Sequence, residues 1–295
     1  MPTNVLVPVD GHERAFAGLE YCFASFPDAT ITALYVVDPT RDHYATVGDV
    51  ESPEQRAQEA AARVLEAAES RAERHGRDLQ TETRTGRPHS QILEHTVEEN
   101  VDHVVVGSHG ESPIAGTYLG RVGEAVVRRS PVTTTVVAEP PTELRERELP
   151  GRVLVPVDGS EQATAALVYA LEEFTDAAIT ALHVVDLPFD HSVGEVKGTY
   201  LESILEELDE RSEEILESAT ERADERDAAL ETDRSYGSPA NEIVEYALDA
   251  EFDQLVMGIH GRSLAARLVT GSVAEAVARR SPLTVTLVRG SPHGT

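Results

Sequence analysis

The chain carries the same domain-sized pattern twice. Three segments recur 148 to 151 residues downstream: 5–11 (VLVPVDG) as 153–159, 107–110 (GSHG) as 258–261 (GIHG), and 128–131 (RRSP) as 279–282. Repeats that stack into solenoids have periods of about 20 to 50 residues, so this much longer period indicates a duplicated domain. The question of function therefore becomes what one domain does and whether both copies still do it.

A chain of 295 residues has room for two domains of ordinary size, each with its own hydrophobic core. We expect a first domain at residues 1–140, a linker at 141–151 and a second domain at 152–290. The predicted linker combines prolines with a charged run and few apolar residues, which is typical of a connecting segment.

The net charge is strongly negative. Fifty-three acidic residues face 25 basic ones, and Lys197 is the single lysine. A field of this sign repels nucleic acids and anionic membranes, both of which need clustered basic residues, so we expect neither as a partner. We interpret the acidic run at 202–227 as a solvated helix face. Acid excess with so little lysine is similar to cytoplasmic proteins of salt-loving microbes, and predicts a halophilic fold that needs screening salt.

The sequence favours a cytoplasmic location. No stretch reaches the roughly 18 apolar residues of a membrane span, and the first residues lead directly into a strand without a secretory signal. The single cysteine, Cys22, excludes an internal disulfide framework and recurs with apolar residues at helical spacing, which indicates a packing thiol. No His-x-x-x-His or Cys/His spacing points to a metal site.

Each copy reads as five strands alternating with four helices. In the first copy the predicted strands are 5–9, 30–37, 79–85, 103–107 and 132–137. The predicted helices are 15–23, 54–75, 90–100 with Ser90 as N-cap, and 120–129.

In the second copy the strands are predicted to begin near Arg152, Ala178, Glu231, Gln254 and Leu283. Its long helix is predicted at 200–226, with a buried stripe of apolar residues at Leu201, Leu205, Leu208, Ile215, Leu216 and Ala219. Continuous apolar strands alternating with amphipathic helices predict two tandem, doubly wound, open parallel sheets, covered by helices on both faces. Ligands of such sheets bind at the carboxyl ends of the strands, where the winding reverses.

A glycine motif follows the fourth strand of the second copy. Gly258-x-x-Gly261, nine residues and then Gly271-Ser272 combine a turn whose N–H groups can converge on an anion with the start of a helix. Asp158, at the end of the first strand, is placed to accept ribose hydroxyls. Taken singly, the glycines also fit ordinary turns, and Asp158 also fits a helix cap.

The whole pattern closely resembles the universal stress protein superfamily, as two tandem copies that span nearly the whole chain. The resemblance implies a Rossmann-like, adenine nucleotide alpha hydrolase-like domain with an open five-stranded sheet that binds ATP, with or without Mg²⁺. It implies that Asp158 holds ribose, that Pro156 and Val157 line adenine, and that the backbone of Val184 meets adenine. The phosphates would contact the remaining motif residues: Gly258, His260, Gly261, Gly271, Ser272 and Val273.

The first copy departs from the pattern at Arg121, where the family has Ser or Thr. The arginine either pairs with phosphate or fills the pocket and keeps it empty. The loop at 262–270 carries two arginines and no acid, whereas the loop at 111–119 carries Glu111 and no base. We therefore expect the second copy to bind nucleotide more tightly. The corresponding first-copy site consists of Asp10, Val36, Gly107, His109, Gly110, Gly120, Arg121 and Val122.

The leading interpretation is an ATP-binding stress protein with little or no hydrolysis. The alternative is an adenine-nucleotide enzyme of a related fold, either a weak ATPase or a transferase of adenylate or phosphoryl groups. A ligand-free scaffold is a third reading, and the intact second motif counts against it. The last strands, at 132–137 and 283–288, alternate Thr with apolar residues, and the resemblance implies that they pair as an internal pseudo-dimer. Association of two chains into a homodimer stays open.

Overall fold

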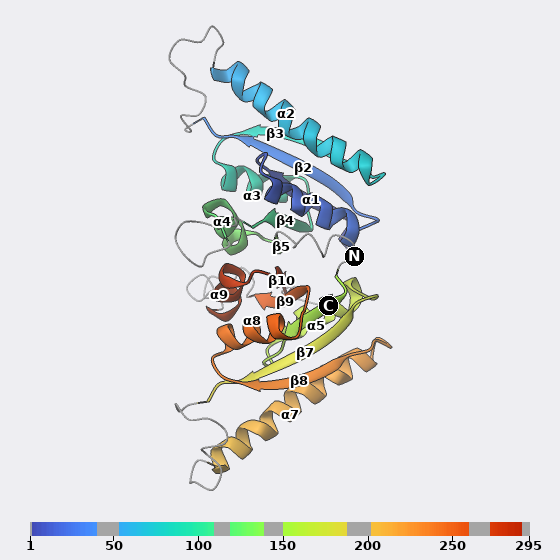
Figure 1. The fold of residues 1–295 in the computed structure, drawn as a ribbon, viewed down its shortest axis with the longest axis vertical. Helices are drawn as coiled ribbons and strands as arrows, with labels where there is room; N and C mark the ends of the chain where they lie inside the picture. The colour runs from blue at the N-terminus through green and yellow to red at the C-terminus, as the bar shows by residue number, and fades with distance from the viewer. Residues whose placement is uncertain are drawn as a thin grey trace. The chain divides into compact units, whose positions relative to one another are not determined.

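The computed structural model describes residues 2–39, 53–108, 119–138, 150–187, 202–259 and 272–290. The chain divides into two compact units, Met1–Glu146 and Arg147–Thr295, and each is treated by itself. Figure 1 labels most of the elements of both units.

The first unit alternates strands with helices, as the apolar periodicity predicts. Its strands are β1 (Asn4–Val9), β2 (Thr30–Val37), β3 (Gln80–Thr85), β4 (His103–Gly107) and β5 (Thr133–Val137). Its helices are α1 (Glu13–Ser25), α2 (Pro53–Arg74), α3 (Pro88–Glu98) and α4 (Arg121–Arg129).

The second unit repeats this order. Its strands are β6 (Arg152–Pro156), β7 (Ala178–Val185), β8 (Glu231–Tyr236), β9 (Gln254–Ile259) and β10 (Thr284–Arg289). Its described helices are α5 (Glu161–Glu173), α7 (Glu202–Asp224), α8 (Pro239–Asp249) and α9 (Ser272–Arg280).

Each unit is a parallel sheet with helices on both faces, which confirms the predicted Rossmann-like fold class. The strand order is β3-β2-β1-β4-β5 in the first unit and β8-β7-β6-β9-β10 in the second. The pairs within each unit are parallel. In the first unit α1 packs with α2, and α3 packs with α4; the second unit pairs α5 with α7 and α8 with α9 in the same way. The winding therefore reverses between β1 and β4, and between β6 and β9.

The N-cap predicted at Ser90 is wrong. Helix α3 begins at Pro88, and Arg87 is its N-cap. Proline favours the first turn of a helix because its fixed φ is helical and its missing N–H would have no partner there. The helix therefore starts before the serine, which lies inside its first turn.

The long helix α7 buries a narrower stripe than predicted. Its buried residues are Leu205, Ser212, Ala219 and Ala223, and Leu201 lies outside the described residues. Ser212 was missed because a serine does not register in an apolar pattern. Leu208, Ile215 and Leu216, which were predicted in the stripe, are only half-buried.

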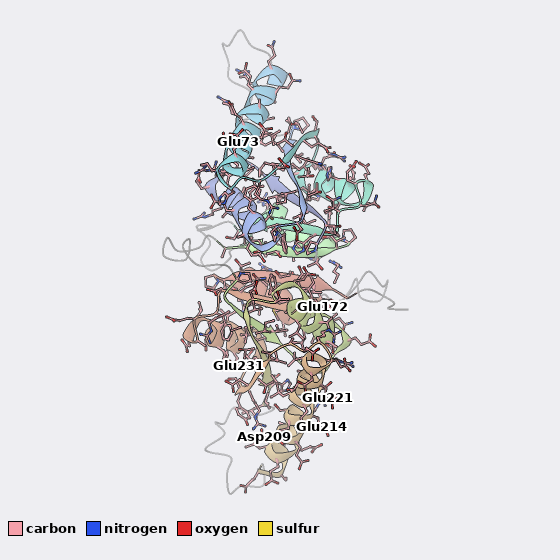
Figure 2. The ribbon with its side chains drawn as sticks, turned by 90° about the vertical axis from the view of Figure 1, so that its right-hand side faces the viewer. Glu73, Glu172, Asp209, Glu214, Glu221 and Glu231 are labelled. Atoms are coloured by element: carbon pink, nitrogen blue, oxygen red, sulfur yellow. The ribbon has the colours of Figure 1, made fainter. Side chains whose placement is uncertain are left out.

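The opposite face of α7 is acidic and exposed. Ten of its 23 residues are Asp or Glu, eight of them exposed, and Figure 2 marks Glu214 and Glu221 among the exposed ones. This arrangement agrees with the interpretation of the acidic run as a solvated helix face. Among the described helices, none combines the length and the apolar character needed to cross a bilayer.

Candidate functional site

The backbone pairing between β6 and β9 stops early, and Pro156 supplies a physical reason. The two strands pair through Val153 with Gln254 and through Leu154 with Leu255. The N–H of Val157 donates to the carbonyl of Leu182 on β7, so alternation along the strand turns residue 156 toward β9. Proline has no N–H to donate on that side, so the ladder cannot continue there. Asp158 and Gly258, described residues of the two predicted motifs, lie beyond this point, where the winding reverses.

Asp158 lies just beyond β6, in a turn that its own side chain stabilises. Its Oδ1 accepts a hydrogen bond from the N–H of Ser160 (3.0 Å), and the side chain is exposed. The N-cap of α5 is Ser160, whose Oγ accepts from the N–H of Ala163 (3.2 Å). The helix cap is therefore supplied by Ser160, which leaves the exposed carboxylate of Asp158 at the strand end.

The turn that presents Asp158 also requires a glycine. Gly159 has a φ of +79°, a left-handed conformation that side chains rarely adopt. The long helix α7 covers this turn: a Cβ at Gly159 would lie 3.3 Å from Cγ1 of Ile215. Backbone conformation and a packed helix together fix the position of the carboxylate.

Gly258 is required by close packing of β9 against α5. A Cβ built at this position would lie 2.0 Å from the carbonyl oxygen of Gln162, in the first turn of α5. Only glycine allows the two backbones to approach so closely. From the sequence, this glycine fits either a turn or a phosphate contact. The structure adds a third role, because Gly258 lets the end of β9 pack closely against α5, the helix that follows Asp158.

The second half of the motif is described only at its end. Helix α9 begins at Ser272, and the N–H groups of its first turn have no acceptor within the helix. Val273 in its first turn is half-buried. The predicted phosphate contacts His260, Gly261 and Gly271 lie outside the described residues.

The predicted adenine-side residues lie on adjacent strands. Pro156 pairs with Leu182 across β6 and β7, Val157 is buried, and Val184 is half-buried two residues further along β7. One residue of this edge was missed from the sequence. His183 directs its Nδ1 to the carbonyl oxygen of Val157 at 2.7 Å. The sequence feature that could have identified His183 is its polar ring near the end of an otherwise apolar strand.

The first copy builds the same turn with different groups. Asp10 Oδ1 accepts from the N–H of His12 (3.1 Å) and lies 3.2 Å from its Nδ1. His12 is the N-cap of α1 and makes no side-chain cap bond, unlike Ser160. Gly107 packs as Gly258 does, since a Cβ there would lie 2.2 Å from the carbonyl oxygen of Arg14.

The remaining first-copy residues divide between described and undescribed positions. Arg121 is the first residue of α4, after the N-cap Gly120, and its side chain is exposed. Val36 and Val122 are half-buried. His109 and Gly110 lie outside the described residues. Within the part of the chain that the structure describes, no three His, Cys, Asp or Glu side chains gather into a metal-binding group.

Comparison with known proteins gives one consistent family. The model of the Universal stress protein family matches residues 1–138 and 150–289. A universal stress protein of Methanocaldococcus jannaschii is 36% identical over 142 residues, which cover 47% of this chain and 81% of that protein. A universal stress protein of Mycolicibacterium smegmatis is 26% identical over 300 residues, which cover 97% of both chains.

A solved structure shares the two-copy arrangement of elements. The crystal structure of a universal stress protein from Archaeoglobus fulgidus covers 97% of this chain and 98% of its own. Its TM-score is 0.68 at 23% identity, which is a likeness of fold.

Proposed function

This chain belongs to the universal stress protein family, and on that premise we propose that its second copy binds ATP at the carboxyl ends of β6, β7 and β9. The observation that carries the proposal is the packing of Gly258 on Gln162. It places the end of β9, where the glycine motif starts, against the helix that begins beside Asp158. Two separate stretches of sequence thus contribute to a single edge.

The chemistry of this edge suits the parts of a nucleotide. Asp158 offers an exposed carboxylate, which accepts hydrogen bonds from ribose hydroxyls as acidic residues do in dinucleotide folds. The start of α9 offers N–H donors and the positive end of the helix dipole, which favour phosphate. The motif residues His260, Gly261, Gly271 and Ser272 are proposed to complete the phosphate contacts. Mg²⁺, where present, would accompany the phosphates of ATP.

We propose that the first copy binds nucleotide more weakly. Its carboxylate Asp10 is already engaged by both the N–H and the ring of His12, whereas Asp158 is engaged by one N–H. Arg121 begins α4 in place of a residue with a hydroxyl donor. Because the Arg121 side chain is exposed, we attribute the weaker binding to the engaged Asp10 and the missing hydroxyl rather than to a filled pocket.

Isothermal titration calorimetry of ATP with matched variants tests the site. Asp158→Ala is expected to lower the affinity at least tenfold, because the ribose hydroxyls lose the carboxylate that accepts their hydrogen bonds. Asp10→Ala is the matched control, and it is expected to leave the tighter binding event within about twofold. Equal losses in both variants, or no heat with the unmodified protein, would contradict the proposal.

We propose that binding proceeds with little hydrolysis, so that the protein acts in the stress response through its nucleotide-bound state. Incubation with ATP and Mg²⁺, followed by chromatography of the nucleotides, tests this part. Intact ATP after many binding lifetimes is expected. Sustained multiple turnovers that Asp158→Ala abolishes would instead support the alternative of an adenine-nucleotide enzyme. The predicted pairing of the last strands and the predicted cytoplasmic location stay predictions.

A further inference from the structure

His183 makes a defined hydrogen bond at the adenine side of the proposed site. Its Nδ1 lies 2.7 Å from the carbonyl oxygen of Val157, and the contact is partly buried. A carbonyl oxygen accepts hydrogen bonds and never donates them, so Nδ1 must carry the proton. The ring therefore acts as a donor to the backbone of the neighbouring strand.

This hydrogen bond occupies the carbonyl oxygen of Val157, which would accept the next hydrogen bond of the parallel ladder between β6 and β7. The register of β6 and β7 ends at Pro156 with Leu182, and the N–H of Val157 still donates to the carbonyl of Leu182 at 2.8 Å. In a parallel ladder the following bond would run from the N–H of Val184 to the carbonyl of Val157. The His183 ring takes that carbonyl, and the regular pairing ends.

The first copy has a tyrosine at this position, and its pairing continues. Tyr35 is the equivalent of His183, and the register of β1 and β2 extends to Val9 with Tyr35. Strand β1 accordingly includes Val9, whereas β6 ends at Pro156. A pair at Val9 and Tyr35 is completed by the N–H of the next residue, Val36. The two copies thus treat the equivalent amides, Val36 and Val184, differently.

The direction of the Val184 backbone follows from the same alternation. Leu182 directs its carbonyl to β6, so Val184, two residues further on, directs both its N–H and its C=O to the same side. β6 has already ended there, and Asp158 stands just beyond. An N–H beside a C=O is complementary to adenine, whose N1 accepts and whose 6-amino group donates.

We propose that His183 is a positioning residue: by donating to the carbonyl of Val157, it keeps the N–H and C=O of Val184 available for the adenine edge. The proposal rests on the proposed function of the second copy as an adenine-nucleotide site. It also gives a second reason, besides Arg121, for the proposed difference in nucleotide affinity between the copies: the backbone N–H of Val184 is available and that of Val36 is not.

Three variants separate the hydrogen bond from the ring itself. His183→Asn places its Nδ2 donor close to the position of Nδ1 and is expected to bind ATP within about threefold of the unmodified protein. His183→Tyr introduces the residue that the first copy has at this position and is expected to weaken ATP binding at least tenfold. His183→Leu removes the donor and is expected to resemble His183→Tyr.

A base-free ligand distinguishes this role from general damage to the site. Ribose 5-triphosphate carries the sugar and phosphates but no adenine, so its affinity is expected to be the same in all three variants. Equal losses for ATP and for ribose 5-triphosphate, or equal losses in the Asn and Tyr variants, would overturn the role of His183. Absence of ATP binding by the unmodified protein would instead overturn the proposed function.

Amide hydrogen exchange of the unmodified protein provides a test that needs no variant. Without ligand, the Val184 amide is expected to exchange at least tenfold faster than the Val36 amide, and ATP is expected to protect it. Equal exchange of the two amides without ligand would show that the ladder is closed in both copies, and would overturn the proposal even if the His183 variants failed to fold.

Discussion

The carbonyl oxygen of Gln162 occupies the space that a side chain at Gly258 would need. A Cβ built on Gly258 would lie 2.0 Å from that oxygen, well inside van der Waals contact. The contact is between two backbones, so no side-chain rotation can relieve it. The close packing of β9 on α5 at the proposed site is therefore possible only because residue 258 has no side chain.

Gly258→Ala is expected to destabilise the protein by about 3 kcal/mol, near the upper end of overpacking costs, because backbone must move. Urea unfolding followed by circular dichroism measures the loss. Gly290→Ala is the matched control, since a Cβ there would lie 3.6 Å from the Cβ of Ala165, an ordinary contact. A Gly258→Ala midpoint equal to that of the control would contradict the expected strain.

Acid sensitivity is expected to arise in part from His103. This residue is buried beside Phe26, with its Nε2 2.9 Å from Oγ1 of Thr135. Burial lowers the pKa of His103 to about 3, although the nearby carboxylate of Asp102 acts in the opposite direction. Between about pH 6.5 and pH 3 the unfolded chain binds a proton that the folded chain refuses. Stability should therefore fall with falling pH, by up to about 1.4 kcal/mol per pH unit from this residue.

His103→Gln is expected to remove that part of the pH dependence. The second copy has Gln254 at the equivalent place, and its Nε2 donates to Oγ1 of Thr286 at 2.9 Å, so the substitution has a structural precedent. Free energies of unfolding at pH 7.5, 6.0 and 5.0 measure the effect. Parallel pH profiles for the variant and the unmodified protein would show that His103 contributes nothing.

Thermal stability is expected to rise with salt. The exposed face of α7 and the net charge of −28 produce self-repulsion, and the screening length falls from about 10 Å at 0.1 M salt to about 3 Å at 1 M. The melting temperature, followed by circular dichroism, should increase by several degrees between 0.1 and 2 M KCl. A constant or falling melting temperature would refute the halophilic interpretation.

Cys22 is expected to be chemically inert in the folded protein. The side chain is fully buried, and burial raises the pKa of its thiol well above the usual value, so almost no reactive thiolate exists at neutral pH. A thiol-specific disulfide reagent should show no reaction with the native protein and about one equivalent after unfolding in guanidinium chloride. Rapid reaction of the native protein would exclude the role of a packing thiol.

Sequence patterns predicted most elements because their signals are local. β2 has the predicted bounds, Thr30–Val37, since a run of β-branched and apolar residues ends at polar turns on both sides. The errors arose where the residue that determined the structure does not contribute to an apolar pattern. Ser90 looked like a cap, but Pro88 had already started the helix, and the buried Ser212 did not count as apolar.

The sequence by itself determined the duplication, the doubly wound parallel fold, and the placement of Asp158 and Gly258 at the carboxyl ends of their strands. These features follow from repetition and periodicity along the chain. Only the tertiary structure decided that Gly258 packs on Gln162 and that His183 takes the carbonyl of Val157. The physical reason is that both contacts join residues far apart in the chain, so their geometry exists only after the strands and helices have packed.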